Sequence, residues 1–404
     1  MNTKVTQNRI NSKLYSFIVA ILPCVMMYKV PVVGKGFATV IVLLSAIVLF
    51  FLIHKIDIEN IKYIVPGCLY LIYMICRSKG NLIEIILQIA AFIHLYAICS
   101  GVVDVEALKK FIINVSIFAS ICVIIQSIVH YSLFIHIPLI NHRLCLEDLQ
   151  RYTTKILTGM DEGIYRPSAF FLEPSHMVQY LMIGLSMCLL DKEKYYNKAF
   201  VISFGMVLTT SGMGIAILIC IWGWFFLNQV RSQKTDKINM LVGGAITSIL
   251  VILLATSIPG FQRVLARIFG SFGDESSSYN AIHGRLFWWN TYFSGLKGSD
   301  LVWGRGSASI PDDYFTGFME LLYAYGIVGV LLYYNMLVYL LCKSNNVISS
   351  CILLMFGALM VFANLTGFIH VIYSIGTTLA IITENEKGSK EKTEPHNRYQ
   401  YIRH

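Results

Sequence analysis

Long, uninterrupted blocks of apolar residues constrain the fold of this 404-residue sequence more than any other feature. The blocks lie at about residues 14 to 30, 37 to 53, 61 to 76, 82 to 100, 111 to 135, 177 to 190, 199 to 227, 238 to 257, 318 to 341 and 347 to 383. Most of them have roughly the 17 to 25 residues that a helix needs to cross about 30 Å of hydrocarbon. Because 56% of the residues are hydrophobic and only 14% are charged, a water-soluble fold could not bury them. The sequence therefore predicts an all-α integral membrane protein.

Two of the blocks are predicted to contain two helices each. The block at 199 to 227 is too long for one ordinary span, and its centre, residues 209 to 214, reads Thr-Thr-Ser-Gly-Met-Gly. Glycine and hydroxyl-bearing residues favour a break, which is tolerated at membrane depth where protein or water surrounds the backbone. The block at 347 to 383 is expected to turn near Asn364 to Gly367. We thus expect about twelve membrane crossings.

The distribution of Lys and Arg predicts the orientation of these spans. With the N-terminus inside and the 199 to 227 block split, most basic residues of the short connectors fall on the cytoplasmic side, as the positive-inside rule requires. Both termini are then cytoplasmic, and two long polar loops, at about 136 to 176 and 258 to 317, are extracytoplasmic. Residues 1 to 383 form one polytopic membrane domain, and the mixed-charge segment 384 to 404 is expected to be a disordered cytoplasmic tail.

Composition and motifs disfavour several classes of function. The net charge of +9 is scattered over connectors, unlike the single basic face of a nucleic-acid-binding protein. Nine of the ten cysteines lie in or beside apolar blocks, so that Cys145 is expected to be a free thiol. The sequence contains no P-loop, no HExxH and no paired CxxC. We therefore expect neither a metal nor a cofactor, which suits a transfer reaction that uses an already activated substrate.

The first long loop ends in the segment Arg-Pro-Ser-Ala-Phe-Phe-Leu-Glu-Pro-Ser-His, residues 166 to 176, directly before a helix. Glu173 and His176 thus lie at a helix entrance, where unpaired backbone N–H groups attract negative charge. One interpretation is an ordinary helix cap with an aromatic anchor at the membrane interface. The other is a functional site, because Arg166, Glu173 and His176 place costly charge at a membrane boundary.

The second long loop is cationic and aromatic. Its candidate binding residues are Arg263, Arg267, His283, Arg285, Trp288, Trp289 and Arg305. Guanidinium groups bind phosphate in a forked geometry, and tryptophan rings suit sugars or lipid headgroups. A membrane-interface belt explains the tryptophans equally well. Within the spans, Glu84, Gln88 and Glu320 are expected to pair with neighbouring helices or to serve a function.

These segments resemble the O-antigen, capsular and exopolysaccharide polymerase family (Wzy-like), a relative of the O-antigen ligases. The resemblance rests on the layout of the spans, RPSAFFLEPSH at 166 to 176, HGRLFWW at 283 to 289, and LVWGRGSASIPDDYFTGFMELLYAYGIVG at 301 to 329. The break at 209 to 214 also looks like the family's Thr- and Ser-rich segment. The Arg that often follows that Ser is Met213 here, so its role is not carried over.

The resemblance implies a GT-C-like, metal-independent membrane glycosyltransferase in the bacterial cytoplasmic (inner) membrane. Its substrate would be an oligosaccharide repeat unit linked to undecaprenyl diphosphate, and its partners the bilayer, a flippase and a chain-length regulator. On this hypothesis Arg166 and Arg285 stabilise the departing diphosphate, and Glu173 deprotonates the acceptor hydroxyl, with His176 and His283 as rival bases. The residues left to bind phosphate or glycan are Arg263, Arg267, Arg305, Trp288 and Trp289.

Two alternatives fit the same sequence. An O-antigen ligase shares the layout and the cationic loops but transfers finished glycan to a different acceptor. A lipid-linked oligosaccharide flippase, or another secondary transporter, also has about twelve spans and broken helices. The two long loops argue against a transporter.

Overall fold

The computed structural model describes residues 2–30, 36–52, 61–78, 82–146, 153–161, 164–191, 193–231, 289, 291–311 and 315–393. Within these residues the regular secondary structure is helical, apart from one short pair of strands. Four helices are long and apolar enough to cross a membrane, namely α5 (Leu82–Cys99), α6 (Val105–Leu133), α10 (Gly212–Arg231) and α15 (Gly317–Lys343). Several shorter apolar helices accompany them. The chain is therefore a multi-pass membrane protein, as the apolar blocks predict.

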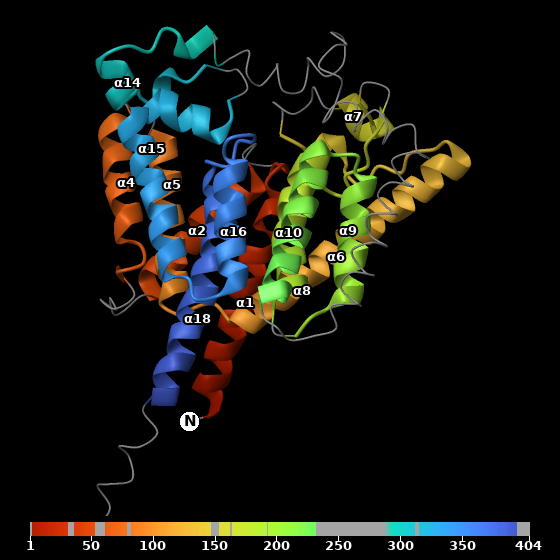
Figure 1. Cartoon of the computed structure of the whole chain (residues 1–404), viewed down its shortest axis with the longest axis horizontal. Helices are drawn as coiled ribbons and strands as arrows, with labels where there is room; N and C mark the ends of the chain where they lie inside the picture. Colours follow the sequence, from red (N-terminus) through yellow and green to blue (C-terminus); the bar gives the residue numbers. More distant parts are fainter. Residues whose placement is uncertain are drawn as a thin grey trace, which may run out of the picture. The chain divides into compact units, whose positions relative to one another are not determined.

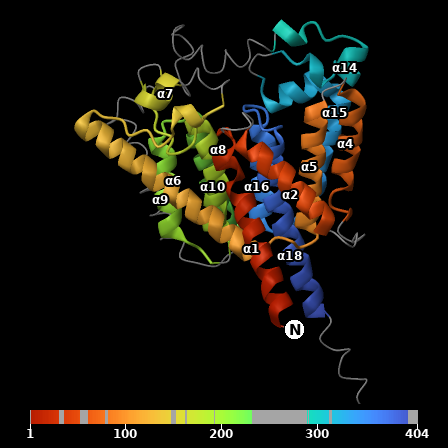
Figure 2. The same cartoon turned by 180° about the vertical axis from the view of Figure 1, so that it is seen from behind.

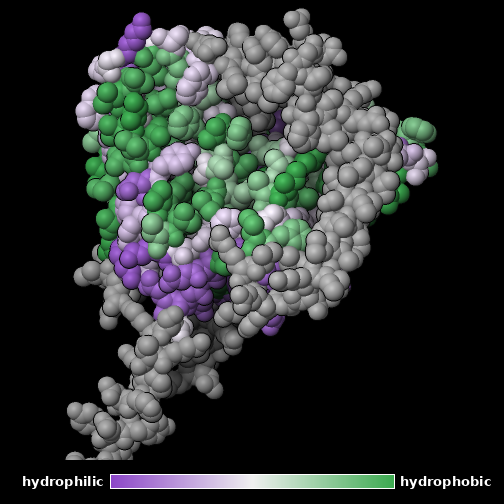
Figure 3. Space-filling model, viewed as in Figure 1, coloured by the Kyte–Doolittle hydropathy of each residue, from purple (hydrophilic) through white to green (hydrophobic). Residues whose placement is uncertain are grey.

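Apolar side chains cover the outer sides of these helices. Leu69 on α4 (Val65–Arg77) is 52% exposed and Leu331 on α15 is 63% exposed. Figure 3 shows such residues gathered over the part of the surface where α4 and α15 lie. Exposing this much apolar area to water costs roughly 25 cal/mol per Å², so the bilayer is the natural solvent for this surface.

The structure divides into two compact units, of which the first comprises Met1–Leu22, Thr39–Phe111 and Ser294–His404. Its further helices are α1 (Asn2–Val25), α2 (Phe37–Leu52), α14 (Ser299–Trp303), α16 (Val347–Leu359), α17 (Phe368–His370) and α18 (Gly376–Thr393), together with the 3-10 turn η4 (Ser307–Ser309) and the π-helical turn η5 (Val371–Ile375). Helix α15 packs against α4, α14 and α16, and α18 packs against α5 and α16 (Figure 1). Helices α1 and α18 also run side by side in both views (Figures 1 and 2).

The second unit comprises Pro23–Ala38 and Ile112–Phe293. Helix α8 (Pro174–Leu190) is buried along almost its whole length and packs against both α9 (Tyr196–Leu208) and α10. Before α8, the long loop folds into the 3-10 turn η1 (His142–Leu144), the short helix α7 (Thr153–Thr158), and the antiparallel strands β1 (Met160–Asp161) and β2 (Ile164–Tyr165). This loop positions the candidate site described below.

The structure confirms both predicted helix breaks. Helix α9 ends at Leu208 and α10 begins at Gly212, and Thr210 between them has a left-handed φ of 51°. Helix α16 ends at Leu359, and the chain turns before α17 begins at Phe368. The predicted span at 238 to 257 lies outside the described residues.

Two predicted boundaries need correction. Helix α6 begins at Val105 instead of near 111, because the Asp104 carboxylate caps it by accepting from the Ala107 N–H at 2.9 Å. Helix α18 continues to Thr393, so the tail predicted to be disordered from 384 onward is helical up to that residue. Glu386 on this extension pairs with Lys62 at 3.1 Å.

Candidate functional site

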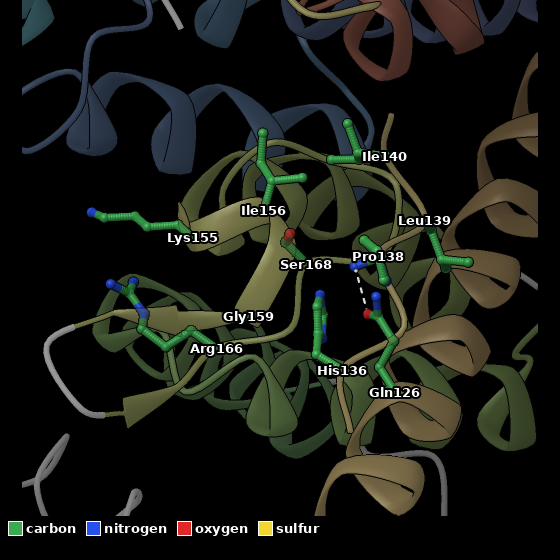
Figure 4. Close-up of a pocket in the computed structure, with 11 residues that line it drawn as sticks. Gln126, His136, Pro138, Leu139, Ile140, Lys155, Ile156, Gly159, Arg166 and Ser168 are labelled. Atoms are coloured by element: carbon green, nitrogen blue, oxygen red, sulfur yellow. Dashed lines mark hydrogen bonds between the residues drawn. The ribbon is translucent and has the colours of Figure 1, made fainter. Parts of the chain in front are cut away.

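A pocket in the second unit combines residues of the first long loop with residues of α6 and α8 (Figure 4). It consists of two adjoining hollows. The residues that line both are Lys155, Gly159, Arg166 and Ser168. The first hollow is completed by Gln126, His136, Pro138, Leu139, Ile140, Ile156 and Ala169, and the second by Met160, Leu172, Glu173 and Pro174. Arg166 and Glu173, both predicted from the sequence, therefore line the same hollow.

The backbone of Gly159 connects the two cations of this pocket. The Gly159 N–H donates to the Lys155 carbonyl at 2.8 Å, and the Arg166 N–H donates to the Gly159 carbonyl at 2.7 Å. Gly159 has a φ of 65°, and a Cβ there would lie 2.6 Å from the Tyr165 ring and 2.7 Å from Nδ1 of His136. Only glycine suits this position. Lys155 and Arg166 extend to the same side of the pocket (Figure 4).

Gln126 on α6, only 2% exposed, joins that helix to the loop at three points. Its amide Nε2 donates to the Ile137 carbonyl at 2.8 Å, and its Oε1 accepts from the Ala169 N–H at 3.1 Å, the dashed line in Figure 4. Its backbone carbonyl accepts from the Tyr165 hydroxyl at 3.1 Å. Ala169 is buried with a φ of 52°, which costs about 1 kcal/mol for a residue with a Cβ. Gln126 thus stabilises a strained turn directly after Arg166.

Tyr165 is held by hydrogen bonds on both its side chain and its backbone. Its hydroxyl lies 2.9 Å from Nδ1 of His136, and its ring stacks on His130 with centroids 3.6 Å apart. The Tyr165 hydroxyl thus lies between the Gln126 carbonyl, which can only accept, and Nδ1 of His136. The hydroxyl of Thr210, in the break between α9 and α10, donates to the Tyr165 carbonyl at 3.0 Å. The helix break therefore helps to position the strand β2, which Arg166 directly follows.

Burial keeps the side chains of Tyr165 and His136 neutral. It raises the pKa of the Tyr165 phenol above its ordinary value, helped by neighbouring Tyr131. It lowers the pKa of His136, although the backbone of Ile156 opposes this by hydrogen-bonding the imidazole. Near neutral pH, positive charge in the pocket therefore comes from Lys155 and Arg166.

Glu173 precedes α8 as its N-cap residue, in extended conformation and followed by Pro174. Proline is favoured at this first helical position, where no intrahelical donor is needed. The Ser175 hydroxyl donates to Oε2 of Glu173 at 3.1 Å. The carboxylate thus lies at the positive end of the helix dipole and lines a hollow with Arg166. Glu173 therefore occupies the N-cap position without a side-chain capping hydrogen bond, and it also lines the pocket.

His176 lies one turn into α8 and is not one of the residues that line either hollow. Its Nδ1 is buried and has no hydrogen-bond partner among the described residues. The next turn of α8 carries Gln179, whose Nε2 donates to the sulfur of Met213 at 3.5 Å. The position at which the resembled family often carries Arg is thus occupied by a thioether that accepts from a buried amide.

The loop has a small apolar core of its own, formed by Ile140, Cys145, Ile156 and Leu172, with Met27 and Tyr28 packed against it. Tyr28 and Cys145 form an antiparallel bridge. Cys145 is a free thiol, as predicted, but it is 2% exposed. Burial also raises its pKa, so the reactive thiolate is disfavoured.

In the first unit, Arg305 takes part in contacts that stabilise the fold. Its Nε lies 3.2 Å from the Asp300 carboxylate, and its two terminal nitrogens donate to the Tyr323 hydroxyl at 3.2 Å and to the Gly295 carbonyl at 3.1 Å. The Arg305 backbone N–H also donates to the Tyr323 carbonyl at 2.9 Å. Arg305 therefore joins α14 to the start of α15.

Two glycines allow this segment to approach α15 closely. Gly304 has a φ of 76°, and Gly326, at a kink inside α15, has a φ of 66°. A Cβ on Gly304 would clash with the backbone just before Gly326, and a Cβ on Gly326 would clash with the backbone of Val302 and Gly304. We call this pair of glycines the glycine interlock. Arg77 at the end of α4 donates to the Trp303 carbonyl at 3.0 Å and to the Gly304 carbonyl at 2.5 Å. The contribution of Arg77 was missed from the sequence.

The acidic residues of the spans pair within the first unit. The Tyr325 hydroxyl donates to Glu84 at 3.0 Å. Glu320 accepts from the Asn364 amide and from the Thr366 hydroxyl, both at 2.8 Å. Pairing with a neighbouring element, as predicted for Glu84, is confirmed, and Glu320 anchors the turn between α16 and α17.

The remaining predicted residues are only partly described. Arg263, Arg267, His283, Arg285 and Trp288 lie outside the described residues. Trp289 stacks on Phe293, with centroids 4.5 Å apart. Lys155, Gln126, His136 and Gly159 were missed from the sequence. Gln126 had a detectable signal, as an amide in the apolar second half of its helix, whereas Lys155 had none.

The pocket thus offers two cations, a carboxylate and a neutral imidazole near the ends of membrane helices, a set suited to binding an anion and moving a proton. Among the described residues, no group of three or more His, Cys, Asp or Glu side chains could hold a metal ion. No protein-family model matches the chain, and no curated protein matches it in sequence.

Proposed function

We propose that the chain is a polysaccharide polymerase that joins undecaprenyl-diphosphate-linked repeat units at the outer face of the bacterial cytoplasmic membrane. The observation that carries the proposal is the shared hollow of Arg166 and Glu173, with Lys155 beside them. A lipid-linked diphosphate brings its anionic group to the membrane boundary, where such a site is needed. Both termini are cytoplasmic in this proposal.

In the proposed reaction Arg166 stabilises the diphosphate as the glycosidic bond breaks, because negative charge develops there. Arg285, from the second long loop, has the same role. Glu173 takes the proton of the acceptor hydroxyl, and that oxygen attacks the sugar carbon from which the diphosphate departs. His283 stays a rival base, while His176 is the weaker candidate because it is not one of the residues that line the hollow.

The broken helix between α9 and α10 also suits a transporter. In this chain the break has a different use, because Thr210 donates from it to the Tyr165 carbonyl of β2, directly before Arg166. This contact favours the enzyme over the transporter.

The proposal is tested by gel profiling of the surface glycan from a deletion strain that carries either the wild-type gene or one of several variants. Arg166→Ala, Glu173→Ala and Arg285→Ala are expected to leave single repeat units, as the deletion does, whereas the wild type restores long chains. Arg143→Ala is the matched control, since Arg143 is an exposed cation of the same loop and is not a pocket-lining residue. Immunoblots establish that each variant is present at equal levels.

The same deletion strain distinguishes the alternatives. A missing ligase leaves long glycan on its lipid carrier, and a missing flippase leaves substrate in the cytoplasmic leaflet, where a leaflet-accessibility assay detects it. Either result contradicts the polymerase. Long chains in the Arg166→Ala and Glu173→Ala strains would contradict the roles of these two residues.

A further inference from the structure

Lys155 accompanies Arg166 throughout the pocket. Both side chains line both hollows, and both extend to the same side of the pocket (Figure 4). Lys155 belongs to α7 and Arg166 follows β2, so their proximity is a result of the folded loop and not of adjacency in the sequence.

Two independent connections fix the spacing of the backbone positions that carry these cations. The first is the backbone of Gly159, which accepts from the Arg166 N–H and donates to the Lys155 carbonyl. The second is the imidazole of His136, which bonds the Tyr165 hydroxyl at 2.9 Å and the backbone of Ile156. Tyr165 directly precedes Arg166 and Ile156 directly follows Lys155. The loop therefore holds the two backbone positions that carry these cations at one separation.

We propose that Lys155 and Arg166 form a cation pair of fixed spacing that binds the two phosphoryl groups of a lipid-linked diphosphate. This inference rests on the proposed function and adds Lys155 to it as a substrate-binding residue. Arg166 supplies a planar fork that matches phosphate oxygens, and Lys155 supplies a point charge for the second phosphoryl group. One cation is enough to bind a monophosphate, whereas two cations at a set distance favour the binding of a diphosphate.

The test measures how prenyl phosphates bind to the purified full-length protein in lipid nanodiscs. Farnesyl diphosphate and farnesyl monophosphate are the probes, and the variants are Lys155→Ala, Lys155→Arg and the control Arg143→Ala. The wild type is expected to bind the diphosphate more tightly than the monophosphate. Lys155→Ala should weaken diphosphate binding by roughly tenfold, the typical value of a charge-assisted hydrogen bond, and reduce the preference for the diphosphate. Lys155→Arg should retain most of the affinity, because the charge persists.

The possible failures are distinguishable. Equal diphosphate binding by Lys155→Ala and the wild type overturns the cation pair alone, since Arg166 and Glu173 are still tested by the glycan profile. An equal loss of affinity in Arg143→Ala also overturns it, because the effect would then be one of general surface charge. A wild type that binds neither probe overturns the cation pair and the proposed function together. The thermal unfolding midpoint of each variant in the same nanodiscs establishes that the protein is folded.

Discussion

A single buried amide organises the loop that carries the candidate site. Gln126 satisfies one carbonyl and one N–H of the loop, at Ile137 and Ala169, from inside an apolar helix. A polar group buried among apolar residues costs free energy unless it is hydrogen-bonded. Removing it adds a second cost, because its buried partners are then left without hydrogen bonds. The loop turn after Arg166 therefore depends on this one side chain.

Gln126→Ala is expected to lower the stability of the protein and to abolish long glycan chains. The variant leaves the buried Ala169 N–H without its acceptor, at a cost of about 1 to 3 kcal/mol, and it releases a turn that is strained at φ 52°. The thermal unfolding midpoint in detergent and the glycan profile are the measurements.

Gln88→Ala serves as the control for this substitution, because it removes the same amide from a half-buried position on α5, in the first unit. A glycan profile of Gln126→Ala that equals that of Gln88→Ala would contradict the proposed importance of the turn.

At the residue scale, the sequence predicted those site residues whose local context is informative. Arg166 and Glu173 were found because charge before an apolar helix is unusual, and the structure places both in one hollow. Lys155 was not found, because it lies in a polar loop where a lysine is ordinary. Its position beside Arg166 depends on the backbone hydrogen bonds of Gly159, a result of how the loop folds that no apolar or charge pattern encodes.

At the element scale, glycines determine how the helices of the first unit meet the loop before α15. Gly326 has φ 66° and ψ −170°, a region that glycine alone adopts readily. The kink there lets the backbone of Val302 and Gly304 approach α15. The Tyr73 hydroxyl secures the same place by donating to the Tyr325 carbonyl at 2.9 Å.

Gly326→Ala is therefore expected to destabilise the protein by about 1 to 3 kcal/mol, the usual cost of overpacking, beyond the cost of its backbone conformation. Gly357→Ala is the control, since a Cβ there would lie 3.5 Å from Leu337, an ordinary contact, inside the regular helix α16. The control should be neutral or slightly stabilising, because alanine is the better helix former. Equal unfolding midpoints for the two variants would show that the glycine interlock adds nothing to stability.

The elements themselves were largely predictable, because apolar length and break residues are local signals. The break at 209 to 211 and the turn before α17 both follow from short runs of small or polar residues. The fold of the first long loop was not predictable. Helix α7 and the pair β1–β2 have only six and four residues, and tertiary hydrogen bonds of Tyr165 with Gln126 and Thr210 hold β2 in place.

At the scale of the whole molecule, the break between α9 and α10 determines which side of the membrane the second long loop occupies. Two separate helices return the chain to the side from which it came, whereas one continuous span would not. Lys and Arg in the short connectors favour the first arrangement. The structure agrees with the first arrangement in one respect: α9, with 13 residues, is a helix separate from α10.

Cysteine labelling tests this topology directly. In a background with Cys76, Cys220 and Cys342, which are exposed, replaced by serine, Arg143→Cys reports on the first long loop and Lys297→Cys on the second. Both positions are exposed, and both variants are expected to react with a membrane-impermeant maleimide in intact cells. Glu106→Cys, whose parent side chain is 84% exposed at the start of α6, should react only after permeabilisation. Labelling of Arg143→Cys but not of Lys297→Cys would place the two loops on opposite sides. A site that needs both Arg166 and Arg285 could then not form, because a charge cannot reach across about 30 Å of hydrocarbon.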